Sequence, residues 1–113
     1  MSAAAARLEL TFHALADVSR LGMVERLSRG PASVMELAEP LDMALPSVMK
    51  HLRVLEQGRL VRSKKEGRVR IYTLEPKAFT AIERWVVQRR QLWSTRFDRL
   101  DQLLAEEDDA TSE

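Results

Sequence analysis

Apolar residues recur at helical spacing through the first quarter of the chain. A first set, at Leu8, Phe12 and Leu15, follows an alanine-rich start and predicts a helix over about residues 5–16. A second set predicts another helix, at Val18, Leu21, Val24 and Leu27. Asp17 is a suitable N-cap for this second helix, and Gly30 followed by Pro31 should end it.

Two further helices are expected in the middle of the chain. Ser33, with Glu36 three residues later, is a capping-box pattern and predicts a short third helix that ends before Pro40. A fourth helix should begin near Ala44 or Leu45 and end near Gly58. A short helix, a tight connection and a second helix in this order indicate a helix-turn-helix.

After the fourth helix the apolar period changes from 3.6 residues to 2. Residues 60–63 and 68–74 alternate around a turn at residues 65–67, where Gly67 can supply a positive φ, so a two-stranded hairpin is expected. Pro76 then opens a last helix with near-heptad apolar spacing. From 77 to 105 this helix would span about 40 Å at about 1.5 Å per residue.

The fourth helix should present different faces to the core and to the solvent. Its apolar positions cluster on one side, at Val48, Leu52 and Leu55. On the opposite side are polar and basic residues and a proline, at Pro46, Lys50, Arg53 and Gln57, with Leu45 and Met49 on one flank and His51 on the other. This arrangement is typical of a helix that enters the DNA major groove; the alternative is an ordinary amphipathic helix with solvated charges.

Positive charge is concentrated in the same part of the chain. The net charge of the protein is only +1, but residues 50–70 contain eight basic and two acidic side chains. In the hairpin the basic residues are Arg62, Lys64, Lys65, Arg68 and Arg70, and strand alternation should turn Arg68 and Arg70 away from the core. These side chains can neutralise DNA phosphates, although charge that protects an exposed hairpin from edge pairing is the alternative.

Several classes of function find no support in the sequence. The chain has no cysteine, so disulfides and thiolate metal sites are excluded. Its two histidines, His13 and His51, lie on different predicted helices without matching carboxylates, and no serine has a plausible base, so an enzyme is not expected. We also expect no cofactor, and no long apolar segment or export signal suggests a membrane or a secreted protein, so the expected location is the cytoplasm.

The chain should form one winged helix-turn-helix domain over residues 1–106, followed by an acidic tail, 107–113, that we expect to be disordered. The predicted fold class is mainly α with a small β-hairpin, in the order four helices, two strands and a final helix. This final helix is too long to be buried by so small a domain. Its apolar seam therefore favours a dimer, the alternative being that it only covers its own core.

Three segments together resemble the ArsR-type (ArsR/SmtB) winged helix-turn-helix regulators. They are LADVSRLGMVERL, PSVMKHLRVLEQGRLV and EGRVRIYTL, within a resemblance that covers about residues 8–104. The resemblance implies a dimeric transcriptional repressor that binds an inverted-repeat operator in double-stranded DNA. It also implies that the fourth helix and the hairpin wing contact the DNA, and that the first and last helices pair the subunits.

These expectations define two sets of residues. The expected DNA-binding residues are Ser33, Val34, Leu45, Pro46, Ser47, Met49, Lys50, His51, Arg53, Lys64, Lys65, Arg68 and Arg70. The expected homodimer interface comprises Leu8, Phe12, Leu15, Phe79, Ile82, Val86, Trp93, Phe97 and Leu100. A ligand pocket at the dimer interface could be lined by Leu8, Phe12, Phe79, Trp85 and Trp93, but core packing explains these residues better, and the sequence indicates no particular effector.

The chain departs from the family pattern at its recognition helix. Where the family usually has Ser-Gln it has Ala44-Leu45, and where a second serine is common it has Met49. Leu45 and Met49 either touch thymine methyl groups or turn inward to pack. The usual glycine before the Leu-Val pair is Arg59, with Gly58 one place earlier, so the helix end could be shifted by one residue.

The metal ligands of the family's metal-sensing members are also missing. The third helix lacks the paired cysteines, and residues 78–104 contain no histidine. We therefore predict a DNA-binding regulator without a metal-sensing site. The alternative is a winged-helix module that binds an acidic protein partner within a larger complex.

Overall fold

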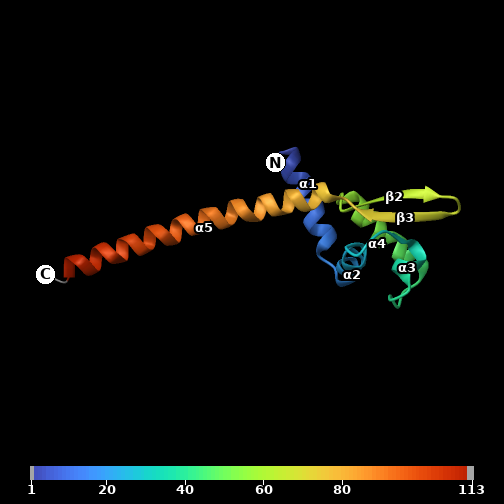
Figure 1. The fold of residues 1–113 in the computed structure, drawn as a ribbon, viewed down its shortest axis with the longest axis horizontal. Helices are drawn as coiled ribbons and strands as arrows, with labels where there is room; N and C mark the ends of the chain where they lie inside the picture. The colour runs from blue at the N-terminus through green and yellow to red at the C-terminus, as the bar shows by residue number, and fades with distance from the viewer. Residues whose placement is uncertain (1, 112–113) are drawn as a thin grey trace. The chain divides into compact units, whose positions relative to one another are not determined.

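The computed structural model describes residues 2–111 (Figure 1). It contains eight elements, which are α1 (Ala3–Leu15), α2 (Val18–Leu27), β1 (Ala32–Ser33), α3 (Val34–Ala38), α4 (Leu45–Gln57), β2 (Val61–Glu66), β3 (Val69–Leu74) and α5 (Pro76–Thr111). The chain divides into two compact units, Met1–Thr80 and Ala81–Glu113. All elements before α5, and its first turn, belong to the first unit. The single domain expected over residues 1–106 stays a prediction.

The helix starts lie where the capping residues predict them. The Asp17 carboxylate accepts the Arg20 backbone N–H at 3.0 Å and begins α2. Ser33 and Glu36 form the expected capping box at the start of α3, with each side chain accepting the other residue's backbone N–H. These local bonds satisfy N–H groups that a helix leaves without partners in its first turn.

The end of α4 has a Schellman geometry. The Leu60 N–H donates to the Leu55 carbonyl and the Arg59 N–H to the Glu56 carbonyl, both at 3.0 Å. The left-handed residue of this motif is Arg59, with φ 57°, whereas Gly58 has φ −77°. The left-handed residue at the end of α4 is therefore an arginine, at the position where the resemblance implies a glycine.

The wing belongs to a three-stranded antiparallel sheet in the order β1-β3-β2. The predicted hairpin of β2 and β3 is confirmed, with Gly67 at φ 63° in the turn. The expectation of only two strands was wrong, because β1 pairs Ala32 with Tyr72 and Ser33 with Ile71. A strand of two residues has no periodicity that a sequence pattern could reveal.

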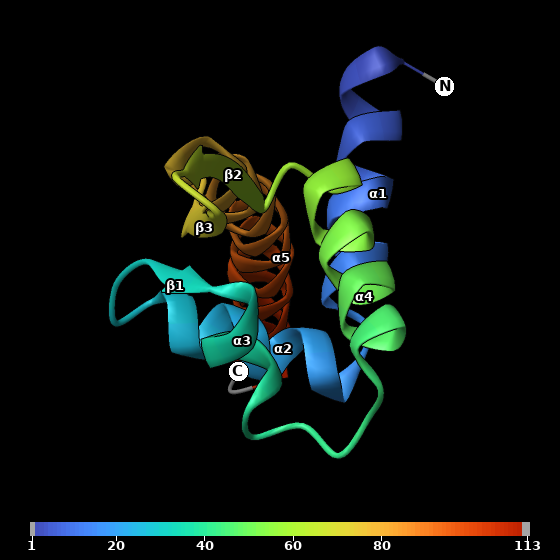
Figure 2. The same cartoon turned by 90° about the vertical axis from the view of Figure 1, so that its right-hand side faces the viewer.

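The core of the first unit joins the helices to the base of this sheet (Figure 2). Its fully buried large side chains come from four elements and the α4–β2 connection, and they are Met23, Leu37, Val48, Leu52, Leu55, Leu60 and Tyr72. Helix α1 lies beside α4, where the buried Thr11 hydroxyl donates to the Gly58 carbonyl at 2.8 Å. This contact ties the C-terminal end of the predicted recognition helix to α1.

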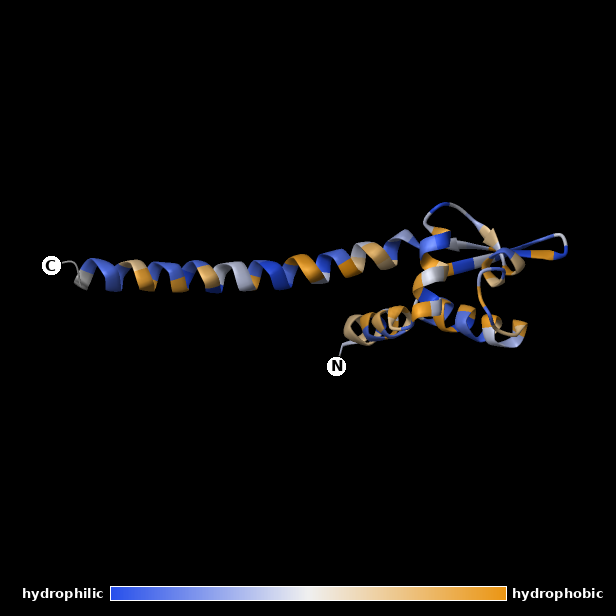
Figure 3. Ribbon diagram, turned by 90° about the horizontal axis from the view of Figure 1, so that it is seen from below, coloured by the Kyte–Doolittle hydropathy of each residue, from blue (hydrophilic) through white to orange (hydrophobic). Residues whose placement is uncertain are grey.

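Helix α5 is continuous over 36 residues and is longer than the predicted 77–105. Residues 107–111 of the predicted acidic tail, expected to be disordered, continue this helix, and 112–113 lie outside the described residues. Apolar and polar residues alternate along it turn by turn (Figure 3). From residue 81 onward nearly every described side chain is exposed, so the second unit has no core of its own.

Candidate nucleic-acid interface

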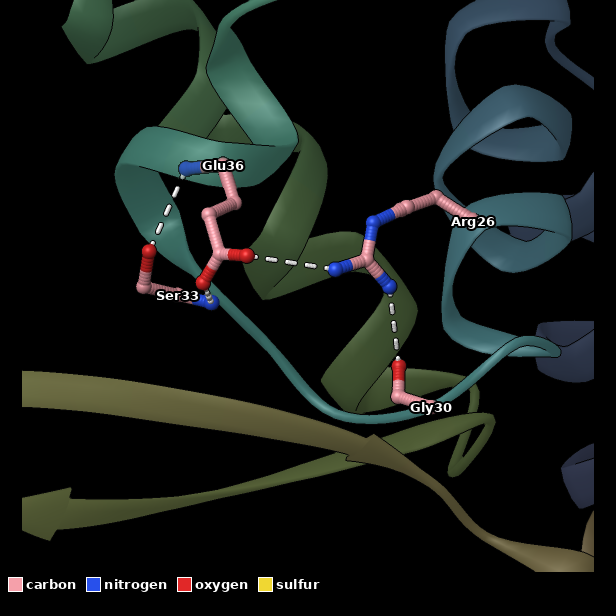
Figure 4. Close-up of polar contacts among 4 residues, drawn as sticks. All are labelled: Arg26, Gly30, Ser33 and Glu36. Carbon is pink, nitrogen blue, oxygen red and sulfur yellow. Dashed lines mark hydrogen bonds and ion pairs between the residues drawn. The ribbon is translucent and has the colours of Figure 1, made fainter.

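The connection before the helix-turn-helix is held by one arginine. Arg26 donates from Nη1 to the Gly30 carbonyl at 3.1 Å and from Nη2 to Glu36 Oε2 at 3.2 Å (Figure 4). The other oxygen of Glu36 accepts the Ser33 N–H, and this bond is the largest cause that lowers the pKa of Glu36. The Ser33 hydroxyl oxygen, expected at the DNA, accepts the Glu36 N–H at 3.2 Å.

Helix α4 has the two faces that its sequence predicts. Val48, Leu52 and Leu55 are each 0% exposed and pack into the core. Two basic residues on the opposite face, Lys50 and Arg53, are exposed. Burial of the apolar side chains thus orients the helix, and the charged side chains are left free to meet a polyanion.

The other predicted residues of the helix-turn-helix differ in exposure. Those at the start of α4 are exposed, namely Leu45, Pro46 and Ser47, with Leu45 at 48%. Val34, Met49 and His51 are half-buried. Leu45 is therefore available to touch a base edge, whereas Met49 divides its surface between the protein and the solvent.

The wing exposes all of its predicted DNA-binding residues, which are Lys64, Lys65, Arg68 and Arg70. The predicted alternation was wrong about the face of Arg70, which it shares with Tyr72, a residue that is 1% exposed and buried at the base of the sheet, while Val69 on the other face is 48% exposed. Arg70 is exposed because it pairs with Lys65 near the turn, beyond the buried base. Burial raises the pKa of Tyr72. Arg70 Nη1 donates to Ser63 Oγ at 2.8 Å, which restrains its guanidinium on β2.

Arg20 connects this surface to the rest of the first unit, and the sequence pattern did not identify it. Arg20 is 9% exposed, and its Nη1 lies 3.0 Å from Nδ1 of His51 on α4. Asp17 Oδ2 lies 3.8 Å from the same ring nitrogen. The Arg20 N–H is the largest cause that lowers the pKa of Asp17. Arg20 and His51 are separated by 31 residues, so no local spacing reveals the pair.

The residues expected at a dimer interface lie in both units. On α1, Leu8 and Leu15 are half-buried and Phe12 is 36% exposed. On α5, Phe79 and Ile82 are half-buried, and the later members are exposed, at Val86, Trp93, Phe97 and Leu100. The ring centroids of Trp93 and Phe97 lie 5.8 Å apart, so these exposed aromatic residues form one patch on the helix.

Two features are missing from residues 2–111. Among these residues no three histidine, cysteine, aspartate or glutamate side chains gather in a group that could hold a metal ion. No helix within the same range has the length and apolar character needed to cross a membrane.

Comparison with known proteins places these features in a family context. A helix-turn-helix domain model matches residues 15–64. The HTH-type transcriptional regulator Rv2034 of Mycobacterium tuberculosis is 37% identical over 100 residues, which are 88% of this chain and 91% of that protein.

Solved structures of ArsR-family regulators are also similar to this chain. The crystal structure of an ArsR family transcriptional regulator has a TM-score of 0.77 and 48% identity, covering 83% of this chain and 97% of the other. The homodimeric winged helix-turn-helix DNA-binding domain of a possible ArsR-family regulator from Mycobacterium bovis has a TM-score of 0.61 and 26% identity. That match covers 81% of this chain and 91% of the other.

Proposed function

The chain belongs to the ArsR family of winged helix-turn-helix transcriptional regulators, and we propose that it is a homodimeric repressor that binds an inverted-repeat operator. Two copies of α4 would enter successive major grooves about one DNA turn apart, with each wing on the flanking backbone. An operator that overlaps a promoter would then exclude the polymerase.

One observation carries this proposal: a single helix, α4, buries its apolar face completely and exposes basic residues on the other. Lys50 and Arg53 lie on that exposed face, and β2, which follows α4 and contacts it, bears Lys64 and Lys65. Phosphate contacts from such side chains supply affinity and register. Leu45, exposed at the start of α4, is the candidate for contact with a thymine methyl group.

Selection of bound duplexes from random DNA, followed by a salt titration of the best one, tests the proposal. We expect a palindromic sequence, affinity that falls steeply with salt, and a preference over random duplex of about a thousandfold or more. Binding without preference for any duplex would contradict a sequence-specific regulator. It would favour a module that binds an acidic protein partner through the wing.

Single-charge variants then test which surface is used. Lys50→Ala should weaken binding to all duplexes and reduce the slope of log K against log[salt] by about 2 for a dimer, since each phosphate contact contributes about 0.9. The matched control is Arg7→Ala, which removes an exposed charge from α1. An equal change of slope in both variants would show that α4 is not the contact surface.

We place the dimer contact of the second unit on the apolar row of α5. Between residues 83 and 99 the helix carries five arginines and two acidic residues, and between 101 and 109 it carries five acidic residues and no basic one. Antiparallel pairing with a second copy would set the basic half of each helix against the acidic half of the other. The exposed Trp93 and Phe97 would supply the apolar centre of this contact.

The absence of cysteine makes this arrangement directly testable. Arg96→Cys places a thiol near the midpoint of the paired segment, so two copies should cross-link on mild oxidation. Gln91→Cys, on the opposite side of the helix from Trp93, is the control and should remain largely uncross-linked. Equal cross-linking of the two variants would contradict antiparallel pairing through this row.

We further propose that operator binding does not depend on a metal. The support is chemical, since the chain has no cysteine and its last helix lacks histidine over residues 78–104. Operator affinity should be the same with EDTA and with added Zn²⁺. A reproducible change of affinity with Zn²⁺ would overturn this part of the proposal.

A further inference from the structure

The Arg20 side chain is held by the end of α1. Its Nε donates to the Ala14 carbonyl at 2.7 Å and its Nη2 to the His13 carbonyl at 3.3 Å. Both carbonyls lie in the last turn of α1, where a helix leaves C=O groups without their usual partners, and the His13 carbonyl also accepts the Ala16 N–H at 3.1 Å. The guanidinium is therefore restrained on α1 independently of anything it contacts on α4.

The third contact of the guanidinium determines the tautomer of His51. Nη1 lies 3.0 Å from Nδ1 of that histidine. A guanidinium is always protonated and only donates, so Nδ1 must accept. A neutral imidazole that accepts at Nδ1 carries its proton on Nε2, and the arginine thus selects one of the two neutral tautomers.

The opposite edge of the ring reaches the solvent. Asp17 Oδ2 also approaches the ring at Nδ1, at 3.8 Å, which is too long for a hydrogen bond, and this oxygen already accepts the Arg20 N–H. Within residues 2–111 no buried side-chain nitrogen or oxygen lacks a partner. Nε2 contacts no protein acceptor there, so it is accessible to the solvent. His51 adjoins the exposed Lys50 on α4.

We propose that Arg20 is a positioning residue for DNA binding, which holds neutral His51 so that its Nε2–H donates to a phosphate oxygen of the DNA backbone. The inference rests on the proposed function, because it requires the outward face of α4 to lie against DNA. Arg20 is 9% exposed and acts through the ring, without touching the DNA itself. A backbone contact of this kind sets the register of the helix in the groove.

Two variants of His51 distinguish the roles of its two ring nitrogens. His51→Gln keeps an N–H donor near the position of Nε2, whereas His51→Asn keeps only a shorter group that can accept from Arg20. Against the selected palindromic duplex we expect His51→Asn to lose about threefold in affinity per subunit, hence roughly tenfold for a dimer. His51→Gln should bind the same duplex with an affinity close to that of the wild type. Equal losses in both variants would overturn the proposal.

The tautomer itself is measurable without any substitution. In ¹⁵N-labelled wild-type protein, the neutral ring of His51 should show an unprotonated Nδ1 and a protonated Nε2, and the Nε2–H signal should shift on addition of the duplex. A protonated Nδ1 in the neutral ring, or an Nε2–H that does not respond to DNA, would refute the assignment. This measurement remains decisive even where Arg20 variants fold poorly.

A double-mutant cycle distinguishes positioning from general stabilisation. Arg20→Lys should weaken DNA binding and redistribute the His51 tautomers, but should add little to the effect of His51→Asn. Additive losses would show that Arg20 does not act through His51. If wild-type protein shows no preference for any duplex, the proposed function fails; if wild-type binding is intact and the cycle is additive, only this inference fails.

Discussion

Two adjacent positions at the end of α4 should respond to small substitutions with opposite signs. A Cβ at Gly58 would lie 2.8 Å from Ala14 Cβ, 2.9 Å from the Leu10 carbonyl oxygen and 3.3 Å from Thr11 Cα. Two of these three atoms belong to the α1 backbone, so relief requires α1 to move. Arg59 instead adopts φ 57° with an exposed side chain, so glycine would relieve its backbone.

The magnitudes follow from competing effects. Gly58→Ala gains about 0.4–1 kcal/mol from the lower entropy of the unfolded chain, but overpacking costs about 1–3 kcal/mol, so we expect a net loss of about 1–2 kcal/mol. The left-handed conformation costs Arg59 about 1–2 kcal/mol, and glycine loses about 0.5–1 kcal/mol through its own entropy. Arg59→Gly should therefore raise the free energy of unfolding by about 0.5–1 kcal/mol.

Urea denaturation at a fixed protein concentration measures both changes, because dimerisation makes stability depend on concentration. Gly22→Ala is the matched control, since a Cβ there has no atom within 4 Å and α2 should gain about 0.8–1 kcal/mol. A Gly58→Ala variant as stable as wild type would show that α1 moves enough to accommodate the added Cβ where it contacts the end of α4. An Arg59→Gly variant that is destabilised would refute the account of the helix end.

Three further predictions concern acid, the operator and the dimer. The folded pKa of Asp17 lies below its ordinary value of 3.8, so its contribution to stability is complete above that value and is lost as pH falls through the folded pKa. In acid denaturation, the free energy of unfolding of Asp17→Asn should therefore fall less steeply with decreasing pH than that of the wild type. Leu45→Gln should change half-site preference by about 1 kcal/mol at one position in a repeated selection, and an unchanged preference would remove Leu45 as a reader. Trp93→Ala should raise the dimer dissociation constant at least thirtyfold, roughly 2 kcal/mol, by analytical ultracentrifugation, whereas Gln91→Ala should leave it unchanged.

The features that the sequence predicted well are those in which a few neighbouring residues determine the structure. Asp17 and Ser33 cap helices through bonds that reach three residues along the chain. The face of α4 that contains Leu52 follows from a period of 3.6 residues, since apolar burial is the main force that orients the helix. The helix-turn-helix and the positions of its basic residues were therefore predictable.

The features that it did not predict arise from contacts between distant segments or from overridden preferences. Strand β1 exists only because Ala32 meets Tyr72, forty residues later. Arg59 adopts a conformation that favours glycine because the bonds of the Schellman motif outweigh its local preference. The continuation of α5 through its acidic end shows that residues 107–111 form a helix although their charge suggested disorder.

Two other long-range contacts restrain α4, and both depend on α1. Its Thr11 hydroxyl binds the carbonyl at the end of α4, and its terminal carbonyls hold Arg20, which in turn binds His51 near the helix centre. A rigid helix held at two points along its length cannot rotate or shift without breaking at least one contact. Apolar burial orients α4, and these two contacts with α1 and Arg20 further restrain the direction of its exposed face. Leu8 and Phe12, which the sequence predicts to be dimer contacts, also belong to α1, so pairing of the subunits would be linked to the presentation of α4 through this one helix.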